Sequence, residues 1–273
     1  MNNLAVRSFT GAGFVIVMMG SVLLGQFVFT LLFLVVVILG MHEFYTLPSD
    51  LRGKPNRILA IATGVALYMT LALHAGRYVD EHIFLLIIPS LFLLFIAELW
   101  RKQSQPFMSI AYALSGIIYI SFPLGLSLYF FNPDFPSGFR HFGVMMGFLL
   151  ILWLNDTGAY LIGSWIGRHR LFERISPKKT WEGSIGGAVI ALLTSWGMAF
   201  LVKDIPLWQW VSIGSITIVF GTLGDLVESL LKRSLGVKDS GTLLPGHGGI
   251  LDRFDALLLA VPFVFVFLAI FSY

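Results

Sequence analysis

Cysteine is absent from this chain of 273 residues. Its absence excludes disulfide bonds, thiolate nucleophiles and thiolate zinc sites, so any metal must be held by oxygen or imidazole ligands. Charged side chains are also scarce, at 12% of the residues, whereas an ordinary soluble domain carries about 25%. Apolar residues make up 57% of the chain. This composition is typical of an integral membrane protein.

Long apolar runs account for most of the sequence. A membrane-spanning helix needs about 20 mostly apolar residues. Residues 9–47 are long enough for two such helices and are interrupted near Gly25-Gln26, so we expect a helical hairpin there. The other expected spans are residues 57–76, 82–99, 107–130, 141–164, 183–202, 207–224 and 254–272. The sequence therefore predicts an all-α, polytopic membrane protein with about nine transmembrane helices.

The basic residues alternate between the two sides of the predicted membrane. Cytoplasmic loops carry an excess of lysine and arginine, and all but three of the 18 basic residues lie on one side. This asymmetry predicts a cytoplasmic amino terminus and places the long polar loops 165–182 and 225–253 on the cytoplasmic face. We expect one membrane domain over residues 1–273, with spans one to five in residues 1–140 and the catalytic spans six to nine in residues 141–273.

Acidic side chains gather in the last polar loop and its flanks. Asp225 with Glu228, and Asp252 with Asp255, form pairs three residues apart, and each pair shares a face if the span ends stay helical. Acids near a membrane usually face a protein interior or a wet cavity. Carboxylate clusters suit Mg²⁺, which substrate phosphates complete. We predict that these four acids form a metal site; pairing with surface basic residues is the alternative, and Lys232 is well spaced for it.

A glycine-rich turn, "LPGHGG" at residues 244–249, precedes the second acid pair. Gly248 and Gly249 can adopt positive φ and bring their backbone amides close to a ligand, and such turns can bind anions. The turn is not a Walker A loop, because no Gly-x4-Gly-Lys-Ser/Thr pattern occurs in the chain. His247 could serve as a phosphate donor, a base or a plain turn residue, and its role stays open.

The loop at residues 165–182 is basic. It holds five basic residues and two acidic ones, whereas residues 225–255 hold four basic and five acidic ones. Cytoplasmic placement alone explains part of this excess. Lys178 and Lys179, however, lie between a proline and an expected helix start, where we expect them to contact phosphate. A metal pocket beside a basic loop is what phosphoryl or nucleotidyl transfer requires.

Four further acids lie within or near the apolar runs. Asp156 is well inside the sixth expected span, and an intramembrane acid is a functional candidate by default. Glu43, Glu98 and Glu182 lie near span ends, where we expect them to be solvated at the membrane interface. No motif that binds DNA or RNA appears, so we expect no nucleic acid partner.

Two stretches of the chain resemble one enzyme family. "SLLKRSLGVKDSGTLLPGHGGILDRFD", residues 229–255, resembles the signature of the phosphatidate cytidylyltransferases, also called CDP-diacylglycerol synthases. "NDTGAYLIGSWIGRHRLFERISPKKTWEG", residues 155–183, is similar to a second stretch of that family. The positions that match the first pattern are Ser229, Lys232, Arg233, Lys238, Asp239, Gly241, Pro245, Gly246, His247, Gly248, Gly249, Asp252, Arg253 and Asp255. The first four spans carry little that is specific to the family.

The resemblance implies a reaction and a location. The reaction is the condensation of CTP with phosphatidic acid to CDP-diacylglycerol and pyrophosphate, in phospholipid biosynthesis. The implied cofactor is Mg²⁺, with a second cation left open. The implied protein is a multi-pass homodimer in contact with the lipids of the cell membrane, with its active site facing the cytoplasm.

The same resemblance, together with the residue spacing, gives an expected site. The expected catalytic residues are Asp225, Lys238, Asp252 and Asp255. The three aspartates would hold the metal that bridges the reacting phosphates, and Lys238 would steady the triphosphate with Lys178 and Lys179. The phosphate of phosphatidate would attack the α-phosphorus of CTP in line. The expected substrate-binding residues are Asp156, Ser176, Lys178, Lys179, Ser229, Asp239, His247, Gly248, Gly249 and Arg253.

Two other functions would use features of this sequence. A polyprenol kinase, which is distantly similar, would use much the same pocket but release a nucleoside diphosphate instead of pyrophosphate. A transporter would carry its binding site near the membrane midplane, between related halves with broken helices. The polar residues of this chain instead gather in two loops on one predicted face. Cytidylyl transfer is therefore the expected function.

Overall fold

The computed structural model describes residues 3–47, 53–131, 143–237, 240–241 and 248–271. Within these residues the chain is helical, apart from one hairpin of two short strands. The chain divides into two compact units. Unit 1 comprises Met1–Tyr129 and Asp239–Arg253, and unit 2 comprises Phe130–Lys238 and Phe254–Tyr273. Helix α10 (Leu251–Phe271) begins in unit 1 and continues in unit 2.

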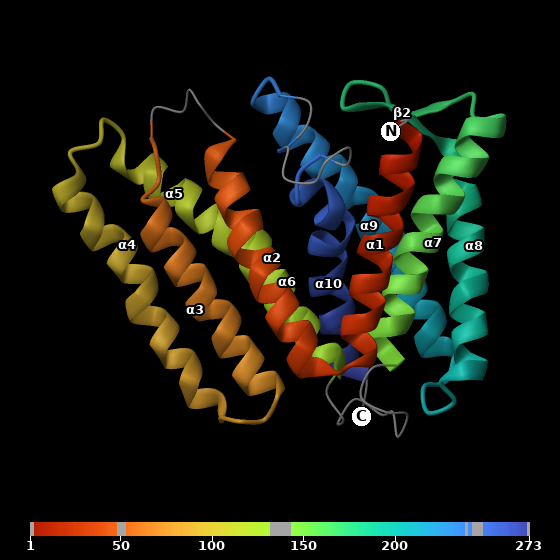
Figure 1. Cartoon of the computed structure of the whole chain (residues 1–273), viewed down its shortest axis with the longest axis horizontal. Coiled ribbons are helices and arrows are strands. Elements are labelled where there is room, and N and C mark those ends of the chain that lie inside the picture. The colour runs from red at the N-terminus through yellow and green to blue at the C-terminus, as the bar shows by residue number, and fades with distance from the viewer. Residues whose placement is uncertain (1–2, 48–52, 132–142, 238–239, 242–247, 272–273) are drawn as a thin grey trace. The chain divides into compact units, whose positions relative to one another are not determined.

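Unit 1 contains the helices that begin before Tyr129, the last of which ends with Phe130 and Phe131 in unit 2 (Figure 1). They are α1 (Asn3–Leu23), α2 (Gln26–Thr46), α3 (Arg57–Ala75), η1 (Glu81–Leu86), α4 (Ile87–Arg101), α5 (Pro106–Gly116), η2 (Ile117–Ser121), α6 (Phe122–Leu126) and η3 (Ser127–Phe131). Gly25 precedes α2 with φ 98°, a conformation that favours glycine, so the expected hairpin of α1 and α2 is confirmed. Buried tyrosines join neighbouring helices: Tyr45 donates to the Ala113 carbonyl at 2.6 Å, and Tyr68 to the Thr30 carbonyl at 2.9 Å.

Unit 2 is built from α7 (Gly143–Ile166), β1 (Arg170–Phe172), β2 (Ser176–Thr180), α8 (Trp181–Leu201), α9 (Leu207–Ser234) and most of α10. Helices α7 and α8 lie side by side (Figure 1). Glycines allow this close approach. A Cβ atom at Gly183 would lie 2.6 Å from the Ala159 carbonyl oxygen, and one at Gly187 would collide with the Asn155 carbonyl. The close packing of α7 on α8 therefore requires glycine at Gly183 and Gly187, where any side chain would collide with α7.

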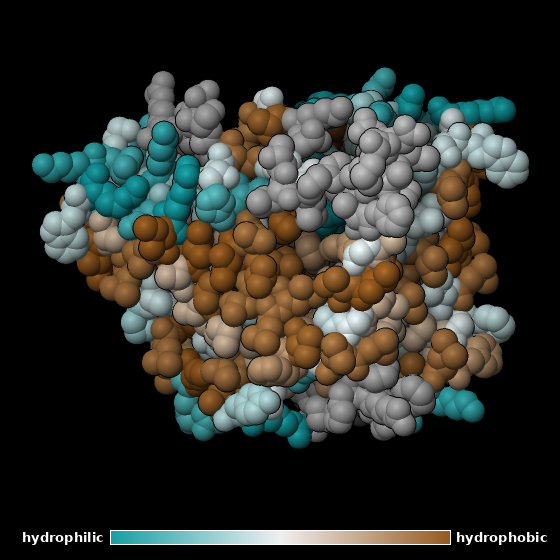
Figure 2. All heavy atoms as spheres, in the orientation of Figure 1, coloured by the Kyte–Doolittle hydropathy of each residue, from teal (hydrophilic) through white to brown (hydrophobic). Residues whose placement is uncertain are grey.

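The structure confirms the prediction of a polytopic, helical membrane protein. Eight of the described helical segments are long and apolar enough to cross a membrane, and the shorter apolar stretch Gly11–Leu23 lies in α1. Hydrophobic side chains cover the middle of the helices, and hydrophilic ones gather toward their ends (Figure 2). The cytoplasmic orientation of the amino terminus stays a prediction.

Two segments differ from the expected boundaries. Helix α9 continues to Ser234 instead of ending at residue 224, so Asp225 and Glu228 lie within a helix and not at its end. The extension is stabilised by an ion pair between Glu228 and Lys232, one helical turn apart. The basic loop at 165–182 contains the β1–β2 hairpin. The short strands show no alternation of apolar and polar residues, since β1 is Arg-Leu-Phe and β2 is Ser-Pro-Lys-Lys-Thr, so no sequence pattern predicted them.

Candidate active site

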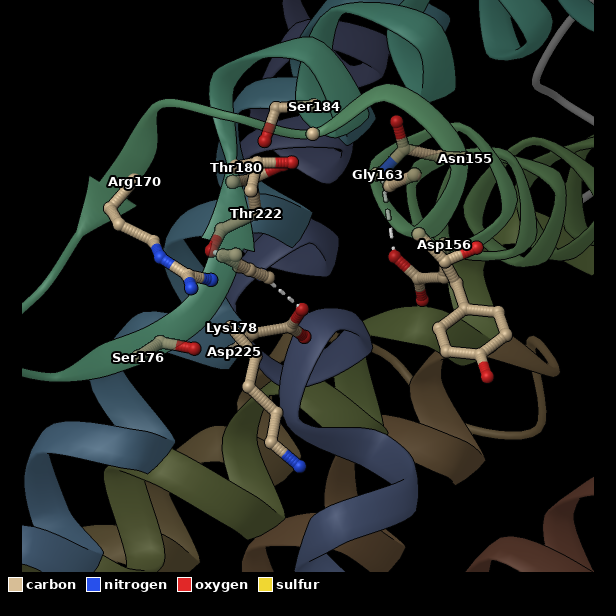
Figure 3. Close-up of a pocket in the computed structure, with 15 residues that line it drawn as sticks. Asn155, Asp156, Gly163, Arg170, Ser176, Lys178, Thr180, Ser184, Thr222 and Asp225 are labelled. Carbon is tan, nitrogen blue, oxygen red and sulfur yellow. Dashed lines mark hydrogen bonds and ion pairs between the residues drawn. The ribbon is translucent and has the colours of Figure 1, made fainter.

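A cavity of about 470 Å³ lies within unit 2, lined by residues of α7, the β1–β2 hairpin, α8 and α9 (Figure 3). Its size falls in the range of small-molecule sites, about 300–1,000 Å³. The charged residues of its lining are Asp156, Arg170, Lys178, Lys179 and Asp225. Cations of the hairpin thus face acids of α7 and α9 across one cavity.

The hairpin is held at both ends by the first turn of α8. The Thr180 hydroxyl accepts a hydrogen bond from the Gly183 amide at 3.2 Å and caps that helix. The Glu182 carboxylate accepts from the backbone amides of Arg168 at 3.1 Å and His169 at 3.2 Å, and it contacts Nδ1 of His169 at 2.6 Å. Glu182 is accessible to solvent, as expected, with 23% of its side chain exposed. Its carboxylate also fixes the chain that leads into β1.

An ion pair joins the hairpin to α9 at the base of the cavity. The ammonium of Lys179 contacts the carboxylate of Asp225 and donates to the Thr222 carbonyl at 3.4 Å. Asp156 accepts a hydrogen bond from the side-chain amide of Asn155 at 3.4 Å, and its charge interacts with those of Asp225 and Lys179. Two carboxyl groups from different helices thus line the cavity with Lys179, which pairs with Asp225.

Two more acids extend this group within unit 2. Helices α9 and α10 pack closely, because a Cβ atom at Gly224 would lie 2.9 Å from the Ala256 Cα atom. The charge of Asp255 consequently repels those of Asp225, Glu228 and Asp156. Glu228 is buried and paired with Lys232. Asp225 pairs with Lys179 and Glu228 with Lys232, so Asp156 and Asp255 bring four carboxyl groups together with two lysines.

This surplus of carboxyl groups over lysines bears on metal binding. Among the described residues, no three histidine, aspartate or glutamate side chains form a group that could hold a metal ion. The donor chemistry of the acids nevertheless fits Mg²⁺, since every donor is a carboxyl oxygen and a divalent cation would favour the ionised form of these acids. Mg²⁺ typically needs only one or two protein carboxylates, because waters and substrate phosphates fill its other positions.

The glycine-rich turn binds a carboxylate of the chain itself. In unit 1, Asp252 accepts hydrogen bonds from the Gly249 amide at 2.8 Å, the Ser240 amide at 3.2 Å and the Ser240 hydroxyl at 2.9 Å. Gly248 has φ +80°, in the region that favours glycine. The expected positive φ is confirmed at Gly248, while the Gly249 amide donates to Asp252.

Another acid of unit 1 was not among the expected site residues. Glu43 of α2 is 3% exposed and accepts hydrogen bonds from the Ile250 and Leu251 amides at 2.8 and 3.1 Å. Our expectation that Glu43 is solvated at the interface is wrong. Glu98 is also buried, and it pairs with Arg101, so the same correction applies to it.

The remaining expected residues have different placements. Lys238, Asp239 and His247 lie outside the described residues. Ser229 is partly exposed on α9, and Arg253 is exposed on α10.

The expected residues that line the cavity are Asp156, Ser176, Lys178, Lys179 and Asp225. Arg170 and Thr222 line it as well, although the sequence reasoning did not include them. Arg170 extends from β1 toward the cavity (Figure 3). The similarity of residues 155–183 to a family stretch was the signal that could have identified it.

Comparison with known proteins identifies the family of the chain. Residues 5–271 match the family described as "Cytidylyltransferase family". A phosphatidate cytidylyltransferase of Staphylococcus aureus (strain COL) is 38% identical over 211 residues, which are 77% of this chain and 78% of the relative. The enzyme of the same name from Staphylococcus epidermidis is 32% identical over 265 residues, 96% of this chain and 98% of the relative. The similarity therefore covers both compact units.

Proposed function

The chain belongs to the cytidylyltransferase family and condenses CTP with phosphatidate to CDP-diacylglycerol and pyrophosphate, and we propose that the cavity of unit 2 binds the CTP. The observation that carries this assignment is the hairpin with Arg170, Lys178 and Lys179 on the cavity wall. Arginine and lysine are the side chains that bind phosphate oxygens most strongly. Three cations on one wall suit a triphosphate.

We infer that Asp225 and Asp255 hold Mg²⁺, with Glu228 and Asp156 adding negative charge around it. The gathering of four carboxyl groups with only two lysines supports this inference. Bound there, Mg²⁺ would neutralise phosphate oxygens and orient the triphosphate. Asp252 as a further ligand, and a second cation, remain predictions.

The chain's own residues then account for the transfer. A phosphate oxygen of phosphatidate forms the new bond to the α-phosphorus of CTP, the bond from that phosphorus to the β-phosphate oxygen breaks, and pyrophosphate leaves. A phosphate monoester is already anionic near neutral pH, so no side chain needs to remove a proton from it. Lys178 and Arg170 stabilise the charge that develops on pyrophosphate. Lys179 holds Asp225 in place and adds a third positive charge beside the triphosphate.

The lipid substrate has a route to this cavity along α7. Tyr160 lines the cavity and is 74% exposed. Leu161 and Trp165 follow it on the same helix and are also exposed. Phosphatidate can place its phosphate beside Tyr160 while its acyl chains stay against the apolar surface.

The protein is a multi-pass protein of the cell membrane. We further propose that the cavity faces the cytoplasm, because the basic loop that forms its wall belongs to the predicted cytoplasmic side. We also propose a homodimer, which size-exclusion chromatography with light scattering in detergent can test.

The reaction is tested with purified protein, phosphatidate, Mg²⁺ and CTP that carries the label on either the α- or the γ-phosphate. We expect the α-label to enter the lipid and the γ-label to appear in pyrophosphate. A lipid that acquires the γ-label would identify a kinase and overturn the proposal. Chelation of Mg²⁺ should stop the reaction, and added Mg²⁺ should restore it; turnover that persists in the chelator would contradict the metal assignment.

A further inference from the structure

Glu43 is a buried carboxylate that contacts a distant segment of the chain. It lies near the end of α2 and is 3% exposed. Its oxygens accept hydrogen bonds from the Ile250 amide at 2.8 Å, the Leu251 amide at 3.1 Å and the Ser240 hydroxyl. A buried carboxylate is costly unless it is hydrogen-bonded. Here the bonds come from the turn and the first residue of α10, about 200 residues away in the sequence.

The position of these donors matters because α10 begins at Leu251. The first amides of a helix have no partner within the helix, and a negative charge is favourable at that end. Glu43 supplies both from a different helix, α2. It therefore determines where α10 starts relative to α2 within unit 1.

The glycines of the turn are required by this contact. A Cβ atom at Gly249 would collide with a carboxylate oxygen of Glu43 and with the Ser240 hydroxyl. A Cβ atom at Gly241 would lie 2.6 Å from the other oxygen of Glu43. The turn is thus shaped to accept the glutamate side chain, which explains the need for glycine at Gly249 without any ligand.

Ser240 connects Glu43 to an expected metal ligand. Its hydroxyl lies within hydrogen-bond distance of both the Glu43 carboxylate and the Asp252 carboxylate, which is 2.9 Å away. Asp252 lies in the first turn of α10, and Asp255 follows on the same helix. The rotation of α10 at its start therefore sets the direction of Asp252.

We propose that Glu43 is a positioning residue for the cytidylyltransferase reaction. It anchors the segment from Ser240 to Leu251 onto α2 and so orients Asp252, an expected metal ligand. The inference rests on the proposed function of this aspartate. Glu43 itself touches neither substrate nor metal, and its effect passes through Ser240 and the start of α10.

The test compares Glu43→Gln with Glu98→Gln in the full-length protein. Both residues are buried glutamates of unit 1, but Glu98 pairs with Arg101 of its own helix. For Glu43→Gln we expect kcat to fall and the Mg²⁺ concentration for half-maximal activity to rise, each by about tenfold, as for other residues that orient metal ligands. The KM for CTP should stay within about threefold, because the lysines of the hairpin are unchanged. Glu98→Gln should behave as the wild type.

A second measurement does not depend on catalysis. Hydrogen exchange of peptides that span residues 248–254 should be faster in Glu43→Gln than in the wild type and unchanged in Glu98→Gln. Ser240→Ala serves as a second variant if Glu43→Gln does not fold, and it should raise the Mg²⁺ requirement in the same direction.

The outcomes separate the possible failures. Unchanged exchange would show that Glu43 is no anchor and would overturn the proposal. Faster exchange with wild-type kcat and Mg²⁺ dependence would show an anchor that does not position the site, and this result would also overturn it. If the wild type forms no CDP-diacylglycerol, the assigned reaction fails, while hydrogen exchange still tests the anchor.

Discussion

Lys179 of β2 forms an ion pair with Asp225 of α9, and this pair ties the basic hairpin to the acidic helix at the base of the cavity. About a quarter of each side chain is exposed, at 26% and 24%. The pair therefore remains accessible to a ligand that enters the cavity. A triphosphate with its metal would meet both charges at once, the phosphates next to the lysine and the cation next to the aspartate.

The first prediction concerns the energetic coupling of this pair. We expect Lys179→Met and Asp225→Asn each to lower the free energy of unfolding, and the double variant to lose less than the sum of the two. The coupling should be at least about 0.5 kcal/mol, which is modest because solvent screens a partly exposed pair. Thermal unfolding of the purified variants in detergent measures it. Additive effects would show that the two side chains do not interact in solution.

The second prediction concerns the proposed metal ligands. Asp255→Asn keeps the shape of the side chain but removes the charge that would bind Mg²⁺, so we expect activity to fall by at least about 100-fold. The variant should remain folded, since Asn also reduces the repulsion from Asp225. Asp204→Asn, an exposed acid that follows α8, is the matched control. Steady-state assays over a range of Mg²⁺ concentrations compare the two variants. Near-normal activity of Asp255→Asn would show that Asp255 is not a metal ligand.

Much of the membrane architecture could be predicted from the sequence because the bilayer imposes strong local requirements. The need for about 20 apolar residues in each span located the helices, and Gly25 marked the turn between α1 and α2. Helix α9 was predicted too short because its last turns combine apolar residues with a buried ion pair, Glu228 with Lys232. A prediction that ends each span where charged residues begin assigns these last turns of α9 to a loop.

The site was predicted only in part, for a physical reason. Spacing within one helix indicated that Asp252 and Asp255 act together, and the position of Lys178 and Lys179 between a proline and a helix start indicated phosphate contacts. The partner of Glu43 could not be predicted, because the Ile250 amide lies 207 residues away and backbone donors leave no trace in side-chain patterns. Long-range contacts of this kind depend on the packing of whole helices.

The third prediction tests the phosphate contacts of the hairpin. Lys178 lines the cavity, whereas Arg174 lies in the turn of the same hairpin and is exposed. We expect Lys178→Ala to raise the KM for CTP by about tenfold or more, since a charge-assisted hydrogen bond contributes about 1.5–3 kcal/mol. Arg174→Ala should leave it unchanged. Initial rates at varied CTP give both values, and equal effects of the two changes would assign only a general electrostatic role to the hairpin.

The fourth prediction concerns the orientation of the protein in the membrane. The chain has no cysteine, so single cysteines can report on each side without background. Arg174 precedes α8 and Asp204 follows it, and both are exposed. We expect a membrane-impermeant maleimide to label Asp204→Cys in intact cells and Arg174→Cys only after permeabilisation. The reverse pattern would place the cavity on the outer face and refute the predicted topology.

The fifth prediction concerns the packing that supports the cavity. Gly187 of α8 faces the Asn155 carbonyl of α7, beside Asp156 in the cavity wall, and a Cβ atom there would collide with that carbonyl. We expect Gly187→Ala to destabilise the protein by about 1–3 kcal/mol through overpacking and to lower activity. Gly197 of the same helix has no neighbour within 4 Å of an added Cβ atom, so Gly197→Ala should be neutral or stabilising by up to about 1 kcal/mol. Melting temperatures in detergent compare the two, and if both substitutions have the same effect, the close packing of α7 on α8 does not limit stability.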